Sequence, residues 1–179
     1  MIKTMLSIVV PLYEEEANVP LLVSEVADKL SEHLYELILI DDGSADGTVA
    51  AIKQARATDE RVVLLQLRRN FGQTAAMSAG FEYARGEFVV YMDGDLQTDP
   101  GDIPKLLKRL QDDDLDMVNG WRKNRKDASL SRNLPSKIAN ALIRRTTKVR
   151  MHDYGCPMKL MRAEVAKNLR LYPLLSPDR

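Results

Sequence analysis

Residues 87–100, EFVVYMDGDLQTDP, lead from an apolar run into a pair of carboxylates. Residues 87–92 lie between two glycines and predict a buried strand. Asp93 and Asp95 follow where this strand gives way to a loop, and side chains at i and i+2 of an extended chain point to the same side. Two adjacent negative charges are unfavourable unless a cation neutralises them. Oxygen ligands with room for water suit Mg²⁺ or Mn²⁺, usually with substrate phosphates completing the coordination shell.

A bare Asp-x-Asp pair has a second and commoner interpretation, a solvated acidic turn ahead of a helix. The rest of the chain bears on the choice, because strand and helix patterns alternate along it. This order predicts a mostly parallel α/β sheet with helices on both faces, in which ligands bind outside the carboxyl ends of the strands. Strand patterns cover residues 5–11, 36–41, 62–67, 87–92 and 116–120, and helix patterns cover residues 18–31, 46–57, 73–84 and 102–111.

The alternation fades beyond residue 120. A basic helix is expected at residues 135–147, a last strand at 154–161 and a last helix at 162–171. No internal repeat and no low-complexity linker interrupts the 179 residues, so one domain is the simplest organisation.

Composition narrows the class of protein. No apolar run approaches the roughly 20 residues that span a bilayer, and no secretory signal is recognised. The chain has a single cysteine, Cys156, which excludes an internal disulfide and fits a reducing compartment. No Cys/His cluster has the spacing of a zinc site.

The net charge of zero hides a division along the chain. Residues 1–121 carry 11 Lys and Arg against 22 Asp and Glu, a net charge of −11, whereas residues 122–150 carry 10 against 1, a net charge of +9. Such asymmetry suggests that the basic segment meets an anion: a nucleoside diphosphate, a phospholipid surface or a nucleic acid. The alternative is a solvated helix face that balances the acidic part. Nucleic acid is the weakest candidate, because the segment lacks interleaved aromatic residues.

Two further motifs follow predicted strands. In residues 10–18, VPLYEEEAN, an aromatic side chain and a carboxylate are suited to hold a nucleobase, although a loop with a helix cap is the commoner explanation for this motif alone. In residues 40–48, IDDGSADGT, Gly43 permits a tight turn, and Asp46 or Thr48 caps the next helix. Asp42 is then free to accept a hydrogen bond from a base or a ribose hydroxyl. A plain turn is the alternative here.

Taken together, the order, spacing and strand context of the three motifs resemble family 2 glycosyltransferases of the GT-A (Rossmann-like) fold. That family typically starts with Pro-x-Tyr-Asn-Glu, and here Glu14 replaces the Asn while Glu15 stays aligned. The resemblance spans about residues 5–172 and is closer still to the polyprenyl-phosphate glycosyltransferases. The segments that carry this closer resemblance are 69–73 (RNFGQ), 92–97 (MDGDLQ), 120–122 (GWR) and 152–156 (HDYGC).

The resemblance implies roles for particular residues. Around the nucleotide it places Pro11, Tyr13, Glu15, Ile40, Asp42, Asp93 and Gly94. The metal and diphosphate site would be formed by Asp93, Asp95 and Gln97, with Mg²⁺ or Mn²⁺ as the ion. Arg122, assisted by Arg132, is expected to contact phosphate, and Asp153 to lie near the reacting centre. The expected catalytic residues are Asp153, Arg122 and Asp95.

The implied activity is transfer of a sugar from a nucleoside diphosphate to a polyprenyl phosphate by metal-assisted, inverting displacement. UDP-glucose is the favoured donor. Two alternatives stay open: an enzyme of the same fold with a soluble or polysaccharide acceptor, and a non-catalytic module that binds nucleotide sugars. An oligomer is compatible with the sequence.

Residues 1–172 are expected to form the catalytic domain and residues 173–179 an irregular tail. Family members usually continue for a further hundred residues or more, with interface helices and often transmembrane helices, and that region is expected to be absent here. A peripheral location at the cytoplasmic side of a membrane would then depend on the basic helix 132–150.

Overall fold

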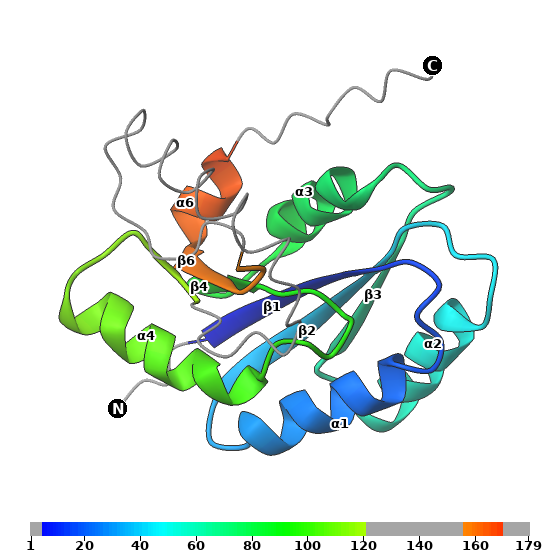
Figure 1. Cartoon of the computed structure of the whole chain (residues 1–179), viewed down its shortest axis with the longest axis horizontal. Coiled ribbons are helices and arrows are strands. Elements are labelled where there is room, and N and C mark those ends of the chain that lie inside the picture. The colour runs from blue at the N-terminus through cyan, green and yellow to red at the C-terminus, as the bar shows by residue number, and fades with distance from the viewer. Residues whose placement is uncertain (1–4, 121–155, 170–179) are drawn as a thin grey trace, which may run out of the picture.

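The computed structural model describes residues 5–120 and 156–169, which form a six-stranded sheet flanked by helices (Figure 1). The strand order is β3-β2-β1-β4-β6-β5. The strands are β1 (Met5–Leu12), β2 (Leu34–Asp41), β3 (Val62–Gln66), β4 (Phe88–Tyr91), β5 (Met117–Asn119) and β6 (Lys159–Arg162). The helices are α1 (Val19–Lys29), α2 (Thr48–Thr58), α3 (Gln73–Tyr83), α4 (Ile103–Asp112) and α6 (Ala163–Asn168), with a 3₁₀ turn η1 (Pro100–Asp102) ahead of α4.

Strands β3, β2, β1 and β4 are parallel, as the alternating pattern predicts. Strand β1 is central, and its residue Val9 pairs with Ile38 of β2 on one side and Tyr91 of β4 on the other. The chain therefore moves outward from β1 to β2 and β3, then returns to the other side of β1 to form β4. This reversal creates a crevice between the carboxyl ends of β1 and β4, where ligands bind in open α/β sheets.

The far edge of the sheet departs from the simple alternation. Strand β6 lies between β4 and β5 and is antiparallel to both. The last strand was expected at residues 154–161, and β6 instead covers Lys159–Arg162. The sheet is thus mostly parallel, as expected. However, β6, which begins about forty residues after the end of β5, lies between β5 and β4.

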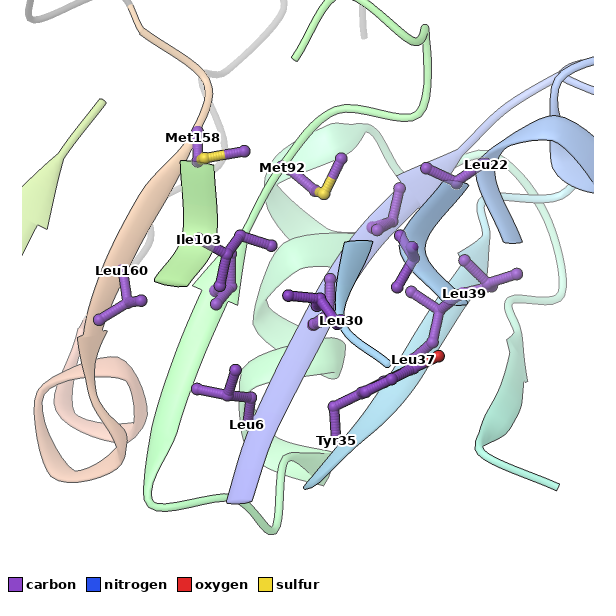
Figure 2. Close-up of a cluster of buried hydrophobic side chains, with 14 of the residues drawn as sticks. Leu6, Leu22, Leu30, Tyr35, Leu37, Leu39, Met92, Ile103, Met158 and Leu160 are labelled. Atoms are coloured by element: carbon purple, nitrogen blue, oxygen red, sulfur yellow. The ribbon is translucent and has the colours of Figure 1, made fainter. Parts of the chain in front are cut away.

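Helices cover both faces of the sheet (Figure 1). Helices α1, α2 and α4 pack on one face, where alternate residues of β1 and β2 meet apolar residues of the helices. Figure 2 shows this cluster, in which Leu6, Leu37 and Leu39 of the strands lie beside Leu22 and Leu30 of the α1 segment. Helices α3 and α6 cover the other face, over Val9, Ile38, Ile40, Val89 and Tyr91.

Helix α3 was expected to pack closely because its residues are small, and the structure confirms it. At Gly80 an added Cβ would overlap the side chain of Val9 and lie 2.9 Å from Cδ1 of Ile40. Only glycine therefore allows the helix to approach the sheet this closely. Within residues 5–120 and 156–169 no helix has the length and apolar character needed to cross a bilayer.

Candidate functional site

A cavity of about 390 Å³ opens at the carboxyl ends of the parallel strands. Its walls come from the loops that follow β1, β2 and β4, and from the loop between β3 and α3. The predicted motifs thus meet at one place, in the crevice where the strand order reverses. The lining residues are Pro11, Leu12, Tyr13, Glu15, Asp42, Asn70, Gly72, Gln73, Asp93, Gly94 and Asp95.

The loop after β1 presents an aromatic ring and a carboxylate to this cavity. Tyr13 lines the cavity and is 47% exposed, so its ring is accessible to a ligand. The loop is tied to the loop after β2 by backbone donors: the N–H of Glu14 donates to Oγ of Ser44 at 2.9 Å, and that of Glu15 to Oγ1 of Thr48 at 2.8 Å. The loop after β1 is therefore held in place by the segment after β2 as well as by its own strand.

Asp42, directly after β2, has hydrogen-bond partners that the sequence did not predict. It lines the cavity, and each carboxylate oxygen already accepts one backbone hydrogen bond: Oδ1 from the N–H of Phe71 at 2.8 Å and Oδ2 from that of Gly72 at 2.9 Å. Gly43, with φ +74°, lets this turn pack against the same loop, where an added Cβ would lie 2.6 Å from Cα of Arg69. Asp42 therefore holds the β3–α3 loop in place.

Ile40 was expected beside the nucleotide, and its side chain does not reach the cavity. It is fully buried and packs with Ala76 and Phe81 on the α3 side of the sheet. The strand pleat explains this placement, since adjacent residues of β2 point to opposite faces.

Asp93, directly beyond β4, is fixed by two neighbours. Its Oδ1 accepts a hydrogen bond from Nε2 of Gln73 at 2.9 Å and one from the Tyr91 hydroxyl at 3.0 Å. Burial, and then the negative charge of Asp93, raise the pKa of the Tyr91 hydroxyl well above its usual value of 10. The hydroxyl therefore stays protonated and remains a donor to the carboxylate.

Asp95 lies two residues further on and is exposed to solvent. Its Oδ1 accepts the backbone N–H of Gln97 at 3.1 Å. Gln97 was expected as a metal ligand; here its backbone orients Asp95, and its side chain is exposed and does not line the cavity. Gly94 separates the two carboxylates, and any larger residue there would overlap the side chain of Leu12.

The donor set suits a hard divalent ion that brings its own ligands. Four carboxylates line the cavity, and no Lys or Arg is present among the described lining residues. In the described part of the chain, the hydrogen bonds from Gln73, Tyr91 and the N–H of Gln97 all reach an Oδ1 atom, so Oδ2 of each carboxylate can bind a ligand. Across residues 5–120 and 156–169 no group of three or more His, Cys, Asp or Glu forms a complete metal cage. Mg²⁺ and Mn²⁺ fit such a site, because they commonly bind one or two carboxylates together with waters and substrate phosphates.

Several expected residues lie outside the described part of the chain. These are Arg122, Arg132, Asp153, the basic helix 132–150 and the tail 173–179.

The third wall of the cavity was not assigned from the sequence. Asn70, Gly72 and Gln73 line it, although the segment 69–73 entered the argument only as part of a resemblance and the helix after it only as core. The available signal was position: this segment follows β3 at the same edge of the sheet as the other three motifs.

Comparison with known proteins gives a consistent result. The family model described as glycosyl transferase family 2 matches residues 7–170. A dodecaprenyl-phosphate galacturonate synthase from Rhizobium johnstonii is 49% identical over 169 residues, which are 93% of this chain and 50% of the relative. An undecaprenyl-phosphate 4-deoxy-4-formamido-L-arabinose transferase from Shewanella sediminis is 44% identical over 165 residues, 90% of this chain and 49% of the relative. The chain spans about half the length of the curated relatives it matches.

Solved structures share the fold at low sequence identity. A mannosyltransferase from Pyrobaculum calidifontis, in complex with GDP-Man and Mn²⁺, has a TM-score of 0.70 at 19% identity, covering 96% of this chain and 48% of that one. Glucosyl-3-phosphoglycerate synthase from Mycobacterium tuberculosis, in complex with Mn²⁺, UDP-Glc and glycerol 3-phosphate, has a TM-score of 0.66 at 18% identity, covering 91% and 58%. These similarities confirm the expected GT-A fold.

Proposed function

Because this chain belongs to glycosyl transferase family 2, we propose that the protein transfers a sugar from a nucleoside diphosphate to a polyprenyl phosphate. The observation that carries the proposal is the meeting of Tyr13 and Glu15 with Asp93 and Asp95 across one cavity. An aromatic face and an acceptor on one wall suit a base, and a pair of carboxylates on the other suits a diphosphate with its cation.

The donor would lie across the ends of β1 and β4. Tyr13 would stack on the base and Glu15 would accept an N–H from it. Asp93 and Asp95 would hold a divalent ion through the oxygens that face the cavity. When bound, that ion supplies Lewis-acid stabilisation of the negative charge on the departing diphosphate. The acidic wall, whose described residues include no Lys or Arg, repels a diphosphate, so we expect donor binding to depend on the ion.

The acceptor chemistry needs little from a general base. A phosphate monoester has a second pKa of about 6, so a lipid phosphate is largely a dianion at neutral pH and attacks C1 without losing a proton. In this scheme Arg122 binds phosphate through its planar fork, and Asp153 orients the acceptor or a sugar hydroxyl. An inverting displacement requires only one such attack.

The two relatives point to the sugar and to the acceptor. Their names specify galacturonate and 4-deoxy-4-formamido-L-arabinose, and neither specifies glucose, so the expectation of UDP-glucose gains no support from them. We propose galacturonate as the first sugar to test, because it belongs to the relative with 49% identity. A polyprenyl acceptor would place the reaction at a membrane surface.

A transfer assay on the full protein tests the proposal. Labelled UDP-galacturonate, UDP-glucose and GDP-mannose are each incubated with polyprenyl phosphate and Mn²⁺, and label is measured in the organic phase. We expect a lipid-linked product from one donor, and a loss of at least about 100-fold in rate for Asp95→Asn. Asp113→Asn is the matched control, because it makes the same chemical change at an exposed residue at the end of α4. This variant should keep the wild-type rate.

The outcomes separate the alternatives. Label transferred to a soluble acceptor but not to lipid would refute the proposed acceptor. Donor binding with no transfer to any acceptor would refute an enzyme and leave a nucleotide-sugar-binding module.

A further inference from the structure

We infer that Gln73 is a positioning residue that orients the Asp93 carboxylate toward the ion and the nucleotide. The inference rests on the proposed function, since it assigns a task to a residue of the same cavity. Gln73 is the first residue of α3 and lines the cavity, and its side-chain amide contacts Tyr91, the last residue of β4, and Asp93 beyond it.

The contacts form a closed triangle. Nε2 of Gln73 lies 2.7 Å from the Tyr91 hydroxyl and 2.9 Å from Oδ1 of Asp93, and the hydroxyl lies 3.0 Å from the same Oδ1. The Gln73 amide has two N–H groups, so it can donate to both neighbours, while the Tyr91 hydroxyl accepts one and donates its own proton to Asp93. The opposite orientation of the amide would set Oε1 of Gln73 against a carboxylate oxygen and is unfavourable.

The donors are themselves held rigidly. Tyr91 is 6% exposed, and its ring meets that of Phe81 edge to face, with centroids 6.3 Å apart. Phe81 belongs to α3, the same helix that carries Gln73. One helix therefore fixes both groups that bind Asp93.

The position of Gln73 also depends on the end of β2. Asp42 accepts the N–H groups of Phe71 and Gly72, the two residues directly before Gln73. Gly72 has φ +90°, a conformation that glycine adopts without strain and other residues rarely adopt. The base side of the cavity is thereby connected to its metal side through the β3–α3 loop.

The consequence concerns the second oxygen of Asp93. With Oδ1 bound by two donors, rotation of the carboxylate is restricted before any ligand arrives, and Oδ2 is the oxygen left for the ion. Residues that orient metal ligands in this way typically change metal affinity or activity by about 10–100-fold when they are removed. We expect a change of this size for Gln73→Ala and a smaller one for Tyr91→Phe, which keeps the packed ring and removes one donor.

Binding of Mn²⁺ to the full protein in the presence of UDP, measured by calorimetry and by electron paramagnetic resonance, tests the inference. Gln73→Ala should bind the ion at least about 10-fold more weakly, with an unfolding midpoint close to that of the wild type. Two matched controls should bind Mn²⁺ as the wild type does. Gln111→Ala changes an exposed residue of α4 at the opposite end of the sheet, and Tyr35→Phe changes a buried residue of β2.

A double-mutant cycle with Asp93→Asn distinguishes positioning from a general structural effect. If Gln73 acts through Asp93, Gln73→Ala should cause no further loss of Mn²⁺ affinity in the Asp93→Asn background. An equal loss in both backgrounds, or wild-type affinity in both Gln73→Ala and Tyr91→Phe, would overturn the inference and leave the proposed function intact. A wild-type protein that binds UDP equally with and without Mn²⁺ would instead refute the proposed metal site itself.

Discussion

Glu14 is strained at the single position where the chain departs from the start typical of its family. Its φ of +56° lies in the left-handed region, where a side chain other than that of Gly or Asn costs roughly 1–2 kcal/mol. The family pattern has Asn at this position, and Asn tolerates the region because its short polar side chain bonds locally. The loop holds the conformation because the N–H of Glu14 is bound by Ser44.

Replacing Glu14 with Asn should therefore stabilise the protein. We expect a gain of about 1 kcal/mol, which corresponds to a rise of about 2–4 °C in the unfolding midpoint for a domain of this size. Calorimetry measures the midpoint directly. Glu25→Asn, within α1, makes the same chemical change in a helix and should give no gain, because Asn is the poorer helix former. A midpoint unchanged or lowered in Glu14→Asn would show that the loop is not strained there.

Asp42 shows what a sequence cannot supply at the scale of one residue. Its place at the cavity could be predicted, because it directly follows a predicted strand. Its hydrogen-bond partners could not, because Phe71 and Gly72 lie 29 and 30 residues away and their N–H groups have no side-chain signature. The same reason hid the contact between Gln73 and Asp93.

At the scale of elements, the boundaries of the first nine helices and strands agree with the sequence within a few residues. Apolar periodicity is a local property, so it predicts local structure well. Strand β6 was harder, because its position depends on pairing with β4, whose residue Phe88 lies opposite Arg162. A local sequence pattern does not predict which edge of a sheet a strand near the end of the chain will join.

The turn between α2 and β3 offers a test of stability against pH. Asp59 accepts two hydrogen bonds from the Arg61 guanidinium, at 2.8 and 2.7 Å, and these bonds, set against some burial, lower the pKa of the Asp59 carboxyl. A lowered pKa in the folded state stabilises the fold above the unfolded value near 3.8, and the contribution is lost as the pH falls through the folded pKa.

Asp59→Asn should therefore cost stability at neutral pH and less in acid. Because Arg61 is partly exposed, we expect a loss of about 0.5–1 kcal/mol at pH 7, shrinking as the pH falls below about 3.8. Urea unfolding at several pH values measures the difference. Asp28→Asn, at an exposed carboxylate, is the control and should show little change at any pH. A penalty that stays constant down to strong acid would contradict an ionic origin.

At the scale of the whole molecule, the acidic part of the chain is the part that forms the cavity. The acidic residues 1–121 contribute all four carboxylates of the cavity, and the described lining supplies no cation to offset them. Under the proposed function, we expect a diphosphate to bind there together with a divalent ion. The division of charge was visible in the sequence, but the concentration of acidic groups at one edge of the sheet follows from the fold.

The account depends on a cation held between the acidic pair and a nucleotide diphosphate, and one crystal tests it most directly. The protein is crystallised with Mn²⁺ and UDP, and anomalous scattering locates the metal. We expect a peak within about 2.0–2.2 Å of a carboxylate oxygen of Asp95 and of a diphosphate oxygen, with the base beside Tyr13. UDP bound with no ion, and with Asp93 and Asp95 both turned away from its phosphates, would contradict the central claim.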